Sequence, residues 1–410
     1  MRQFTAIAIV ALLLSGCEKK TADAQLDTGG QPGSAGVINQ QLANATNRFG
    51  FNLLAALDDA TDVMISPPSV AMALAMTYNG ADGETQKQMA AALEVSGMTM
   101  DELNAAHQEL RNVLTDPKSD VTMKIANSLW ARQGFDFDAD FIARNTAHFG
   151  AEVSTLDFDS PEAPTTINGW VSDNTAKKIP SIVDRIDPAT ILFLINAIYF
   201  KGTWTYTFDK AKTYDATFHH PSGARQRQLM VQDDDFAYLK GDNFQAVRLP
   251  YGKSQRFAMY VFLPDQGSSL SAFGESLSAS KWNQWIGAFG TTKGTVHLPR
   301  FTIMYDQSLG DKLQGLGMID AFDATRANFS RMITVPGENV FISAVKHKTF
   351  MEVNEEGTEA AAVTSVEIGV TSFPGPADPF EMIVNRPFFC AIVDKDSGLI
   401  LFMGKVSEYE

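Results

Sequence analysis

Cysteine is scarce in this 410-residue chain, which contains only Cys17 and Cys390. Cys17 is interpreted below as a lipidated residue, so Cys390 is the one free thiol of the mature chain, and no intramolecular disulfide can form. The apolar run PFFCAIV at 387–393 surrounds Cys390, which predicts a buried strand and a thiol that acts as a small hydrophobic side chain. The fold must therefore be stabilised by its core.

Motifs of catalytic and cofactor sites are also missing. The chain has no Gly-x-Ser-x-Gly, no His-Glu-x-x-His and no phosphate-binding glycine loop. Asp136, Asp138 and Asp140 have the spacing that begins a calcium loop, but Phe141 replaces its glycine and Ala147 its closing glutamate. The sequence therefore predicts no metal site, no cofactor and no enzymatic activity.

Positive charge is in deficit, with 33 Lys and Arg against 48 Asp and Glu and a net charge of −15. Nucleic-acid binding depends on clustered cations, so a nucleic-acid partner is not expected. The predicted helix Asp101 to Leu114 carries one arginine among three acidic residues, so no heparin-like cofactor is expected there either.

A hydrophobic run long enough to cross a bilayer is absent as well. Ala6 to Leu14 is apolar but far shorter than the ~20 residues that a membrane span needs. It follows the basic Arg2 and precedes Leu14-Ser15-Gly16-Cys17, which resembles a bacterial lipobox. We interpret 1–16 as a lipoprotein signal peptide and Cys17 as the lipidated residue. A plain secretory signal with an incidental cysteine is the alternative.

If Cys17 is acylated, its chains anchor the protein to a membrane. Glu18 rather than Asp after the cysteine favours the outer membrane or cell surface, with the protein facing the periplasm or the exterior. Residues 17–37 are rich in Gly, Ala, Asp, Thr and Gln and are interpreted as a flexible tether. No repeat or linker divides the rest, so 38–410 is predicted to be one domain.

The domain is predicted to be α+β, because helical patterns come early and strand patterns late. Ser66 followed by Pro67 is a helix start and Gly80 a stop. The other helices expected are Glu84–Leu93 and Asp101–Leu114. The strands expected are Val121–Ala131, Ile191–Phe200, Phe257–Leu263, and a final hairpin of Met382–Val393 with Leu399–Lys405.

Residues 355–372, EEGTEAAAVTSVEIGVTS, have the pattern of a β-strand that is kept out of its sheet. From Thr358 to Val370 every second residue is uncharged, and both charges of the stretch, Glu359 and Glu367, lie on the other face. This alternation is typical of a half-buried strand. Its small residues would let a backbone enter between two neighbouring strands. A helical or disordered linker is the alternative, since Ala and Glu are helix formers.

The run Glu355, Glu356, Gly357, Thr358, Glu359, Ala360, Ala361 and Ala362 resembles the hinge of the reactive-centre loop in inhibitory serpins. Further segments resemble the same family in the family's order. They are Ile65–Val70, Asn196–Trp204, Met382–Ile392 around Asn-Arg-Pro-Phe, and Leu401–Val406. The chain is thus identified as a member of the serpins, apparently of the inhibitory type.

The resemblance implies the serpin fold, with a dominant central β-sheet, two smaller sheets, a helical layer and an exposed reactive-centre loop at about 355–380. It implies a suicide-substrate inhibitor: a serine protease cuts the loop, and the loop inserts into the central sheet while the acyl-enzyme is still intact. The family's spacing places the reactive bond at Thr371–Ser372. It also places Ser66, Asn196 and His347 together as a polar latch between strands of the central sheet.

The target class follows from what the loop does not contain. No Lys or Arg occurs between Gly357 and Ile383, which excludes a trypsin-like primary pocket. Val370-Thr371 suits an elastase- or subtilisin-like enzyme, and Phe373 would admit a chymotrypsin-like one if the bond lies nearby. The partner that the resemblance implies is a serine protease bound covalently, and the inhibitor is expected to be a monomer. The alternative is a non-inhibitory serpin that acts as a surface binding protein.

Overall fold

Two β-sheets organise the part of the chain that the computed structural model describes, namely residues 37–57, 62–333, 339–358 and 379–409. The first sheet has six strands in the order β10-β11-β12-β4-β2-β3. Their bounds are β2 Val121–Arg132, β3 Glu152–Leu156, β4 Leu192–Thr203, β10 Phe301–Ser308, β11 Ala344–Asn354 and β12 Gly357–Thr358. Strand β4 is a nearly continuous apolar run buried along its length, as expected of a central strand.

The second sheet has nine strands, in the order β1-β15-β14-β8-β7-β6-β9-β13 with β5 paired to β6. The two smaller sheets that the resemblance implies are joined here, because the 18-residue β6 pairs with β5, β7 and β9 along its length. The bounds are β1 Val63–Ile65, β5 Tyr214–His220, β6 Gly223–Lys240, β7 Phe244–Pro250, β8 Phe257–Pro264, β9 Gly290–Pro299, β13 Phe380–Ile383, β14 Phe388–Asp394 and β15 Leu399–Val406.

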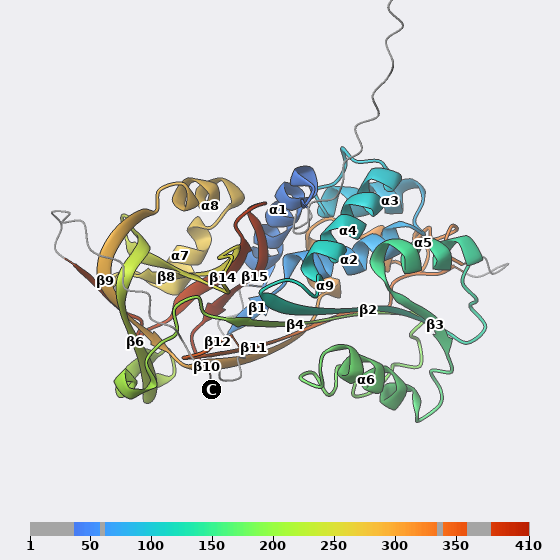
Figure 1. Ribbon diagram of the computed structural model, residues 1–410. Coiled ribbons are helices and arrows are strands. Elements are labelled where there is room, and N and C mark those ends of the chain that lie inside the picture. Colours follow the sequence, from blue (N-terminus) through green and yellow to red (C-terminus); the bar gives the residue numbers. More distant parts are fainter. Residues whose placement is uncertain (1–36, 58–61, 334–338, 359–378, 410) are drawn as a thin grey trace, which may run out of the picture. The chain divides into compact units, whose positions relative to one another are not determined.

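Helices cover both faces of the six-stranded sheet (Figure 1). Helices α1 to α5 lie on one side, with α2 directly against β2 and β4, and α6 lies against the other face, where Trp130, Ile167, Val171, Phe193 and Ile195 belong to a separate apolar cluster. The bounds are α1 Gln40–Ala56, α2 Pro67–Tyr78, α3 Gly83–Ala92, α4 Met100–Leu114, α5 Ala139–Phe149, α6 Ala163–Asn174, α7 Leu270–Ser276, α8 Ala279–Ile286 and α9 Gly310–Gly315. Within the described ranges, no helix is both long and apolar enough to span a membrane.

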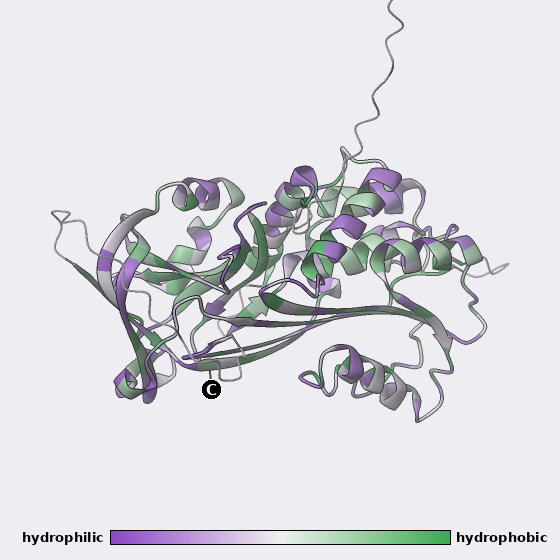
Figure 2. Cartoon of the chain, viewed as in Figure 1, coloured by the Kyte–Doolittle hydropathy of each residue, from purple (hydrophilic) through white to green (hydrophobic). Residues whose placement is uncertain are grey.

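Local sequence explains where these helices begin. Thr99 and Glu102 form a capping box at the start of α4, each side chain bonding the other's backbone N–H. Asp138, part of the calcium-loop mimic, instead caps α5 by accepting from Phe141 N–H at 3.0 Å. Figure 2 shows α2 as mainly apolar and the outer turns of α3 and α4 as hydrophilic, so the amphipathic helices bury one stripe.

The expected helices 67–80, 84–93 and 101–114 are confirmed as α2, α3 and α4, and the α+β class is confirmed with them. One expected strand is wrong: Met382–Val393 is two strands, because β13 ends at Ile383 and pairs with β9 while β14 begins at Phe388 and pairs with β15 and β8. Pro387 stands between them and has no N–H for a ladder. Cys390 is buried in β14 as expected, and burial raises the pKa of its thiol to about 12.

Candidate functional site

The boundary between strands β11 and β4 is called the seam here. The described part of the hinge, Glu355–Thr358, lies at this seam. After β11 the chain turns back and enters the sheet as β12, antiparallel to both neighbours, with Thr358 opposite Val353 on one side and Gly202 on the other. Further down, β11 and β4 pair directly and in parallel, the nearest such pair being Phe350 with Tyr199. Strand β12 therefore occupies the open end of a seam that is closed below it.

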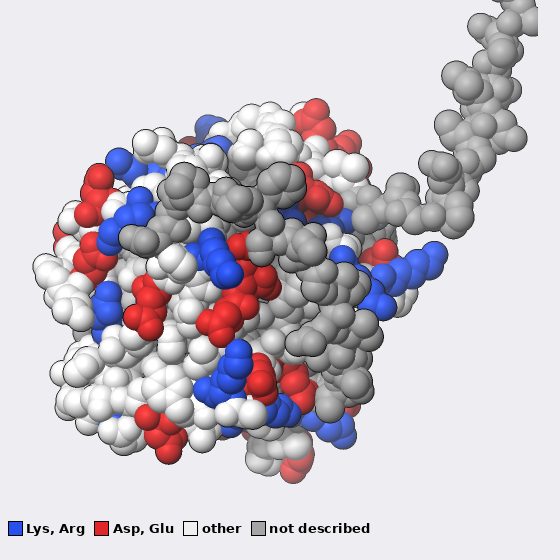
Figure 3. Space-filling model, turned by 60° about the vertical axis from the view of Figure 1, so that its left-hand side comes forward, with Lys and Arg blue, Asp and Glu red and all other residues white. Residues whose placement is uncertain are grey.

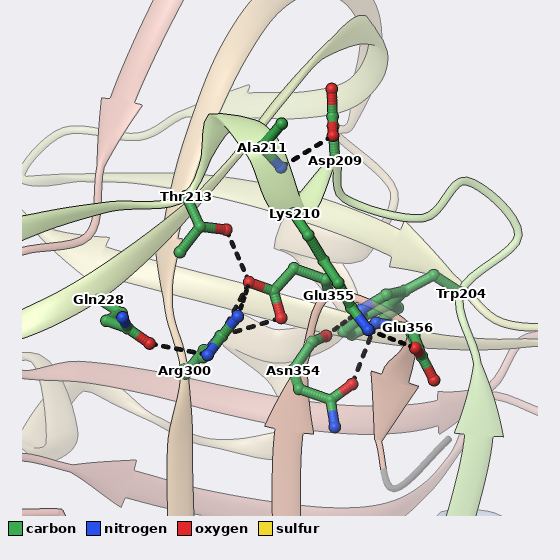
Figure 4. A network of polar contacts seen from close by, with 10 residues as sticks. All are labelled: Trp204, Asp209, Lys210, Ala211, Thr213, Gln228, Arg300, Asn354, Glu355 and Glu356. Carbon is green, nitrogen blue, oxygen red and sulfur yellow. Dashed lines mark hydrogen bonds and ion pairs between the residues drawn. The ribbon is translucent and has the colours of Figure 1, made fainter. Parts of the chain in front are cut away.

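A buried ion pair holds the turn that leads into β12. The side chain of Glu355 is 2% exposed. Arg300 Nε donates to both of its carboxylate oxygens at 2.8 and 2.9 Å, Arg300 Nη2 donates to Oε1, and the Thr213 hydroxyl donates to Oε1 at 2.6 Å (Figure 4). Burial raises the pKa of Glu355, but the hydrogen bonds from Arg300 and Thr213 outweigh it and hold that pKa below its usual range. The carboxylate is therefore ionised and paired.

Further contacts fix the backbone of the same turn. Trp204 donates its backbone N–H to Glu356 O and its indole N–H to Asn354 O, both at 2.9 Å, and Phe208 N–H donates to Glu355 O at 2.9 Å. Lys210 Nζ donates to Glu356 Oε1 at 2.6 Å. The turn is thus tied to one loop, residues 204–213, by backbone and side chain together (Figure 4).

The network is open to solvent beside Arg300 and Lys210. An open hollow of about 410 Å³ adjoins the turn and is lined by Lys210, Arg300, Phe301, Thr302, Glu352, Val353, Asn354, Glu355 and Glu356. Arg300 and Lys210 are 39% and 63% exposed beside it, whereas Glu355 is buried. The cations can therefore leave toward solvent, while an unpaired Glu355 could not stay where it is without loss of stability.

The two residues of β12, Gly357 and Thr358, are suited to their positions by backbone conformation and by burial. Gly357 has φ of 151°, and a Cβ there would lie 2.0 Å from Gly202 O, so another residue would be strained and would clash. Thr358 is fully buried, and its hydroxyl lies 2.6 Å from the hydroxyl of Tyr251. Thr358 thus already points into the core.

Ser66, Asn196 and His347, the predicted latch, lie together beneath the seam and are buried. His347 Nδ1 lies 2.5 Å from Asn196 Oδ1, and the two residues are opposite each other in the β11–β4 register. Ser66 backbone N–H donates to His347 Nε2 at 3.3 Å, so the ring proton is on Nδ1 and donates to Asn196. Burial lowers the pKa of His347 to about 3, which keeps the ring neutral.

The network includes two residues that sequence reasoning missed. Asn196 Nδ2 donates to Ser69 O at 2.9 Å, to Ser69 Oγ at 2.5 Å and to Asn127 Oδ1 at 2.6 Å. Ser69 is one helical turn after Ser66, which could have indicated it, but Asn127 comes from β2 and carries no motif. Ser66 contributes its backbone rather than its hydroxyl, which has no hydrogen-bond partner within the part of the chain described.

Several predicted site residues lie outside the described residues: Thr371, Ser372, the hinge residues Glu359–Ala362, and Cys17. The two ends of segment 359–378 are nevertheless placed. On one side, Thr358 is the last residue of β12 in the six-stranded sheet. On the other side, β13 pairs in parallel with β9 of the nine-stranded sheet. The Phe380 ring stacks on Tyr238 with centroids 3.9 Å apart, so the second end is held by an aromatic contact.

Comparison with known proteins assigns this arrangement to a family. A family model described as Serpin (serine protease inhibitor) matches residues 44–409. The chain is a serpin. Leukocyte elastase inhibitor of Sus scrofa is 34% identical to it over 384 residues, which cover 90% of this chain and 99% of that protein.

Solved serpin structures superpose on it closely. A thermophilic serpin, tengpin, in the native state gives a TM-score of 0.84 at 32% identity and covers 92% of this chain and 97% of its own. Human thyroxine-binding globulin complexed with thyroxine gives 0.82 at 26% identity, covering 90% and 98%. The serpin fold is therefore confirmed. Serpins are protease inhibitors rather than catalysts, and this serpin's seam belongs to the sheet that the resemblance identifies as central.

Proposed function

We propose that this serpin is an irreversible suicide-substrate inhibitor of serine proteases. The protease's serine Oγ attacks the carbonyl carbon of Thr371. The Thr371–Ser372 amide breaks, the new amine of Ser372 leaves with a proton, and an ester links the protease to Thr371. Insertion of the loop then removes this ester from the geometry that water needs to hydrolyse it. The position of β12, already between β11 and β4, is the observation that supports this proposal most.

The register of β12 gives the path of insertion. Because Thr358 is opposite Val353 and Gly202, each later residue would meet a position one lower on both strands. Residue 361 would meet Phe350 and Tyr199, where the direct β11–β4 pairing begins. Residue 364, a threonine, would meet His347 and Asn196. The latch bond must therefore break during insertion, and the hydroxyl of Thr364 arrives where it can replace that bond.

The free energy that drives insertion can be estimated from the number of backbone hydrogen bonds that the inserted loop forms. About a dozen new ladder hydrogen bonds, at ~0.5–1.5 kcal/mol each, approach the ~5–15 kcal/mol that stabilises an ordinary domain. A chain that can gain this much by inserting its loop is kinetically trapped before cleavage. Cleavage releases it because the amino-terminal part of the loop is then free of β13.

The proposed target is elastase- or subtilisin-like, with a chymotrypsin-like enzyme as the second candidate through Phe373. Lys and Arg interleave with Asp and Glu over the described part of the face in Figure 3. Mixed charge gives weak electrostatic steering, so selectivity rests with the loop. The leukocyte elastase inhibitor among its relatives has a name that agrees with this target class.

The test is incubation with pancreatic elastase and with subtilisin, followed by a denaturing gel. We expect a covalent band at the summed mass that is absent when the protease serine is blocked beforehand, and a released fragment that begins at Ser372. The Ala360→Glu variant should be cut without the band, because insertion would bury an unpaired charge. Clean cleavage of the unmodified chain would instead favour a non-inhibitory serpin that acts as a surface binding protein; thyroxine-binding globulin, a structural neighbour, is named for the ligand that it binds.

We also propose that the monomer is exported as a lipoprotein and anchored by acylated Cys17. Two or more acyl chains give stable membrane attachment where one does not. Expression in a bacterium supplied with labelled palmitate tests this. Label should enter the unmodified chain and be lost in Cys17→Ala, with Cys390→Ala as the matched control. Label that persists in Cys17→Ala would refute it.

A further inference from the structure

We propose that Tyr251 is a positioning residue for inhibition: its hydroxyl, bonded to that of Thr358, selects the register in which the hinge enters the sheet. This inference rests on the proposed function. It concerns how insertion starts, and it is carried by contacts among residues on both sides of the seam.

Tyr251 is held rigidly from several directions. Its ring stacks on Trp204 with centroids 4.4 Å apart and 13° between the planes, and the Phe200 ring approaches edge-on at 5.2 Å. Its backbone N–H donates to Phe257 O at 2.8 Å. A Cβ on Gly202 would lie 2.9 Å from the Tyr251 ring, so that glycine makes room for it. A ring so packed presents its hydroxyl at one fixed point.

The chemistry at that point favours a hydroxyl partner. Tyr251 and Thr358 are both 0% exposed, so each hydroxyl depends on the other for the hydrogen bond that water would otherwise supply. Burial, partly offset by the Thr358 bond, raises the pKa of Tyr251 well above its usual value. The phenol is therefore neutral, and the pair can share a proton donor and an acceptor.

The neighbours of Thr358 explain why this contact selects the register. A slip of one residue would turn the hinge over and bring Gly357 or Glu359 to the place of Thr358. Glycine offers no hydroxyl, and a glutamate carboxylate there would be buried without a cation. Thr358 alone satisfies Tyr251, so the hinge docks in the register that later brings Thr364 to Asn196 and His347.

Loss of the contact should slow insertion relative to hydrolysis of the acyl-enzyme. Removing one buried hydroxyl of the pair is expected to weaken docking about fivefold, which is about 1 kcal/mol at 1.4 kcal/mol per tenfold. The stoichiometry of inhibition, moles of serpin consumed per mole of protease trapped, should rise several-fold in Tyr251→Phe. The melting temperature of the uncut protein should change little.

The experiment is a double-mutant cycle of Tyr251→Phe and Thr358→Val, read by hydrogen exchange of the peptide 352–358 in the intact protein. We expect each single variant to exchange about fivefold faster, and the double variant to exchange no faster than the singles, because an apolar pair leaves no unpaired hydroxyl. Tyr260→Phe removes a buried hydroxyl from β8 and is the matched control. If the two substitutions had additive effects on the exchange rate, the two hydroxyls would not interact, and the proposal would be refuted.

The stoichiometry of inhibition with elastase tests the role separately from the contact. An increase in Tyr251→Phe that Thr358→Val reproduces, and that the double variant does not exceed, supports the positioning role. Complexes formed by Tyr251→Phe with unchanged stoichiometry would overturn that role while leaving the proposed function intact. If the unmodified chain traps no protease, the proposed function fails, and the exchange cycle alone then decides whether Tyr251 holds Thr358.

Discussion

Removal of the Arg300 side chain should release the hinge from the sheet. Arg300→Ala leaves the Glu355 carboxylate, 2% exposed, with Thr213 as its remaining side-chain donor among the contacts described above. Removing one partner of a buried ion pair costs about 3–5 kcal/mol. Because Arg300 is itself 39% exposed and solvent screens it, we take the lower end, about 3 kcal/mol. At 1.4 kcal/mol per tenfold, the docked state is weakened about 100-fold.

Native-state hydrogen exchange measures this opening directly. The peptide 352–358 should exchange about 100-fold faster in Arg300→Ala, while a peptide from α6, which packs in a separate apolar cluster, serves as the internal reference. Arg300→Lys keeps the charge but loses the bidentate geometry. Its peptide 352–358 should therefore exchange at a rate between those of the unmodified protein and of Arg300→Ala. Adding Glu355→Gln to Arg300→Ala should restore much of the protection, since an amide has no charge to desolvate.

Unchanged exchange of 352–358 in Arg300→Ala would refute the reasoning. The hinge would then be held by its backbone bonds and by Thr358 alone, and the ion pair of Figure 4 would be a surface contact of little consequence. Faster exchange throughout the protein would instead show that Arg300 stabilises the whole fold rather than the hinge.

Three further predictions concern the rest of the fold. Arg256→Ala removes the bidentate partner of Asp394, whose side chain is 0% exposed, and should lower the free energy of unfolding by about 3–5 kcal/mol in urea denaturation; a loss below 1 kcal/mol would show that the carboxylate finds another partner. His347→Ala breaks the latch and should increase polymers or spontaneously inserted monomer on native gels after mild warming, whereas unchanged monomer and unchanged inhibition would contradict the latch. Burial lowers the pKa of His107 and of His347 to about 3, whereas both side chains are protonated near pH 6.5 in the unfolded chain. The free energy of unfolding should therefore fall as pH drops from about 6.5 toward 3. The fall should be less steep in His107→Leu, and equal slopes in the variant and the unmodified protein would refute this linkage.

Local sequence was sufficient for much of the fold. The helix start at Ser66-Pro67 and the buried runs in β4 and β8 could be predicted, because they depend on neighbouring residues and on apolar patterns that are visible in the sequence. The family resemblance placed Asn196 and His347 in contact, and they are 2.5 Å apart. It also indicated a hinge at Glu355–Ala362, the first residues of which enter the seam.

Residues that act through tertiary contact could not be found in this way. Arg300 lies 55 positions before Glu355 and Tyr251 lies 107 before Thr358, and neither has a sequence pattern that points to its partner. The break at Pro387 was missed because apolar residues on both sides of it suggested one strand. The joining of the two smaller sheets depends on the length of β6, which alternation alone does not fix.

The central claim is that the uncut serpin is kinetically trapped above a more stable, inserted form. Calorimetry of the protein before and after a single cut within 359–378, made by a trace of a protease that it does not trap, tests this directly. With about a dozen new hydrogen bonds, the melting temperature of the cut form should rise by about 10 °C or more. An unchanged melting temperature would contradict the account.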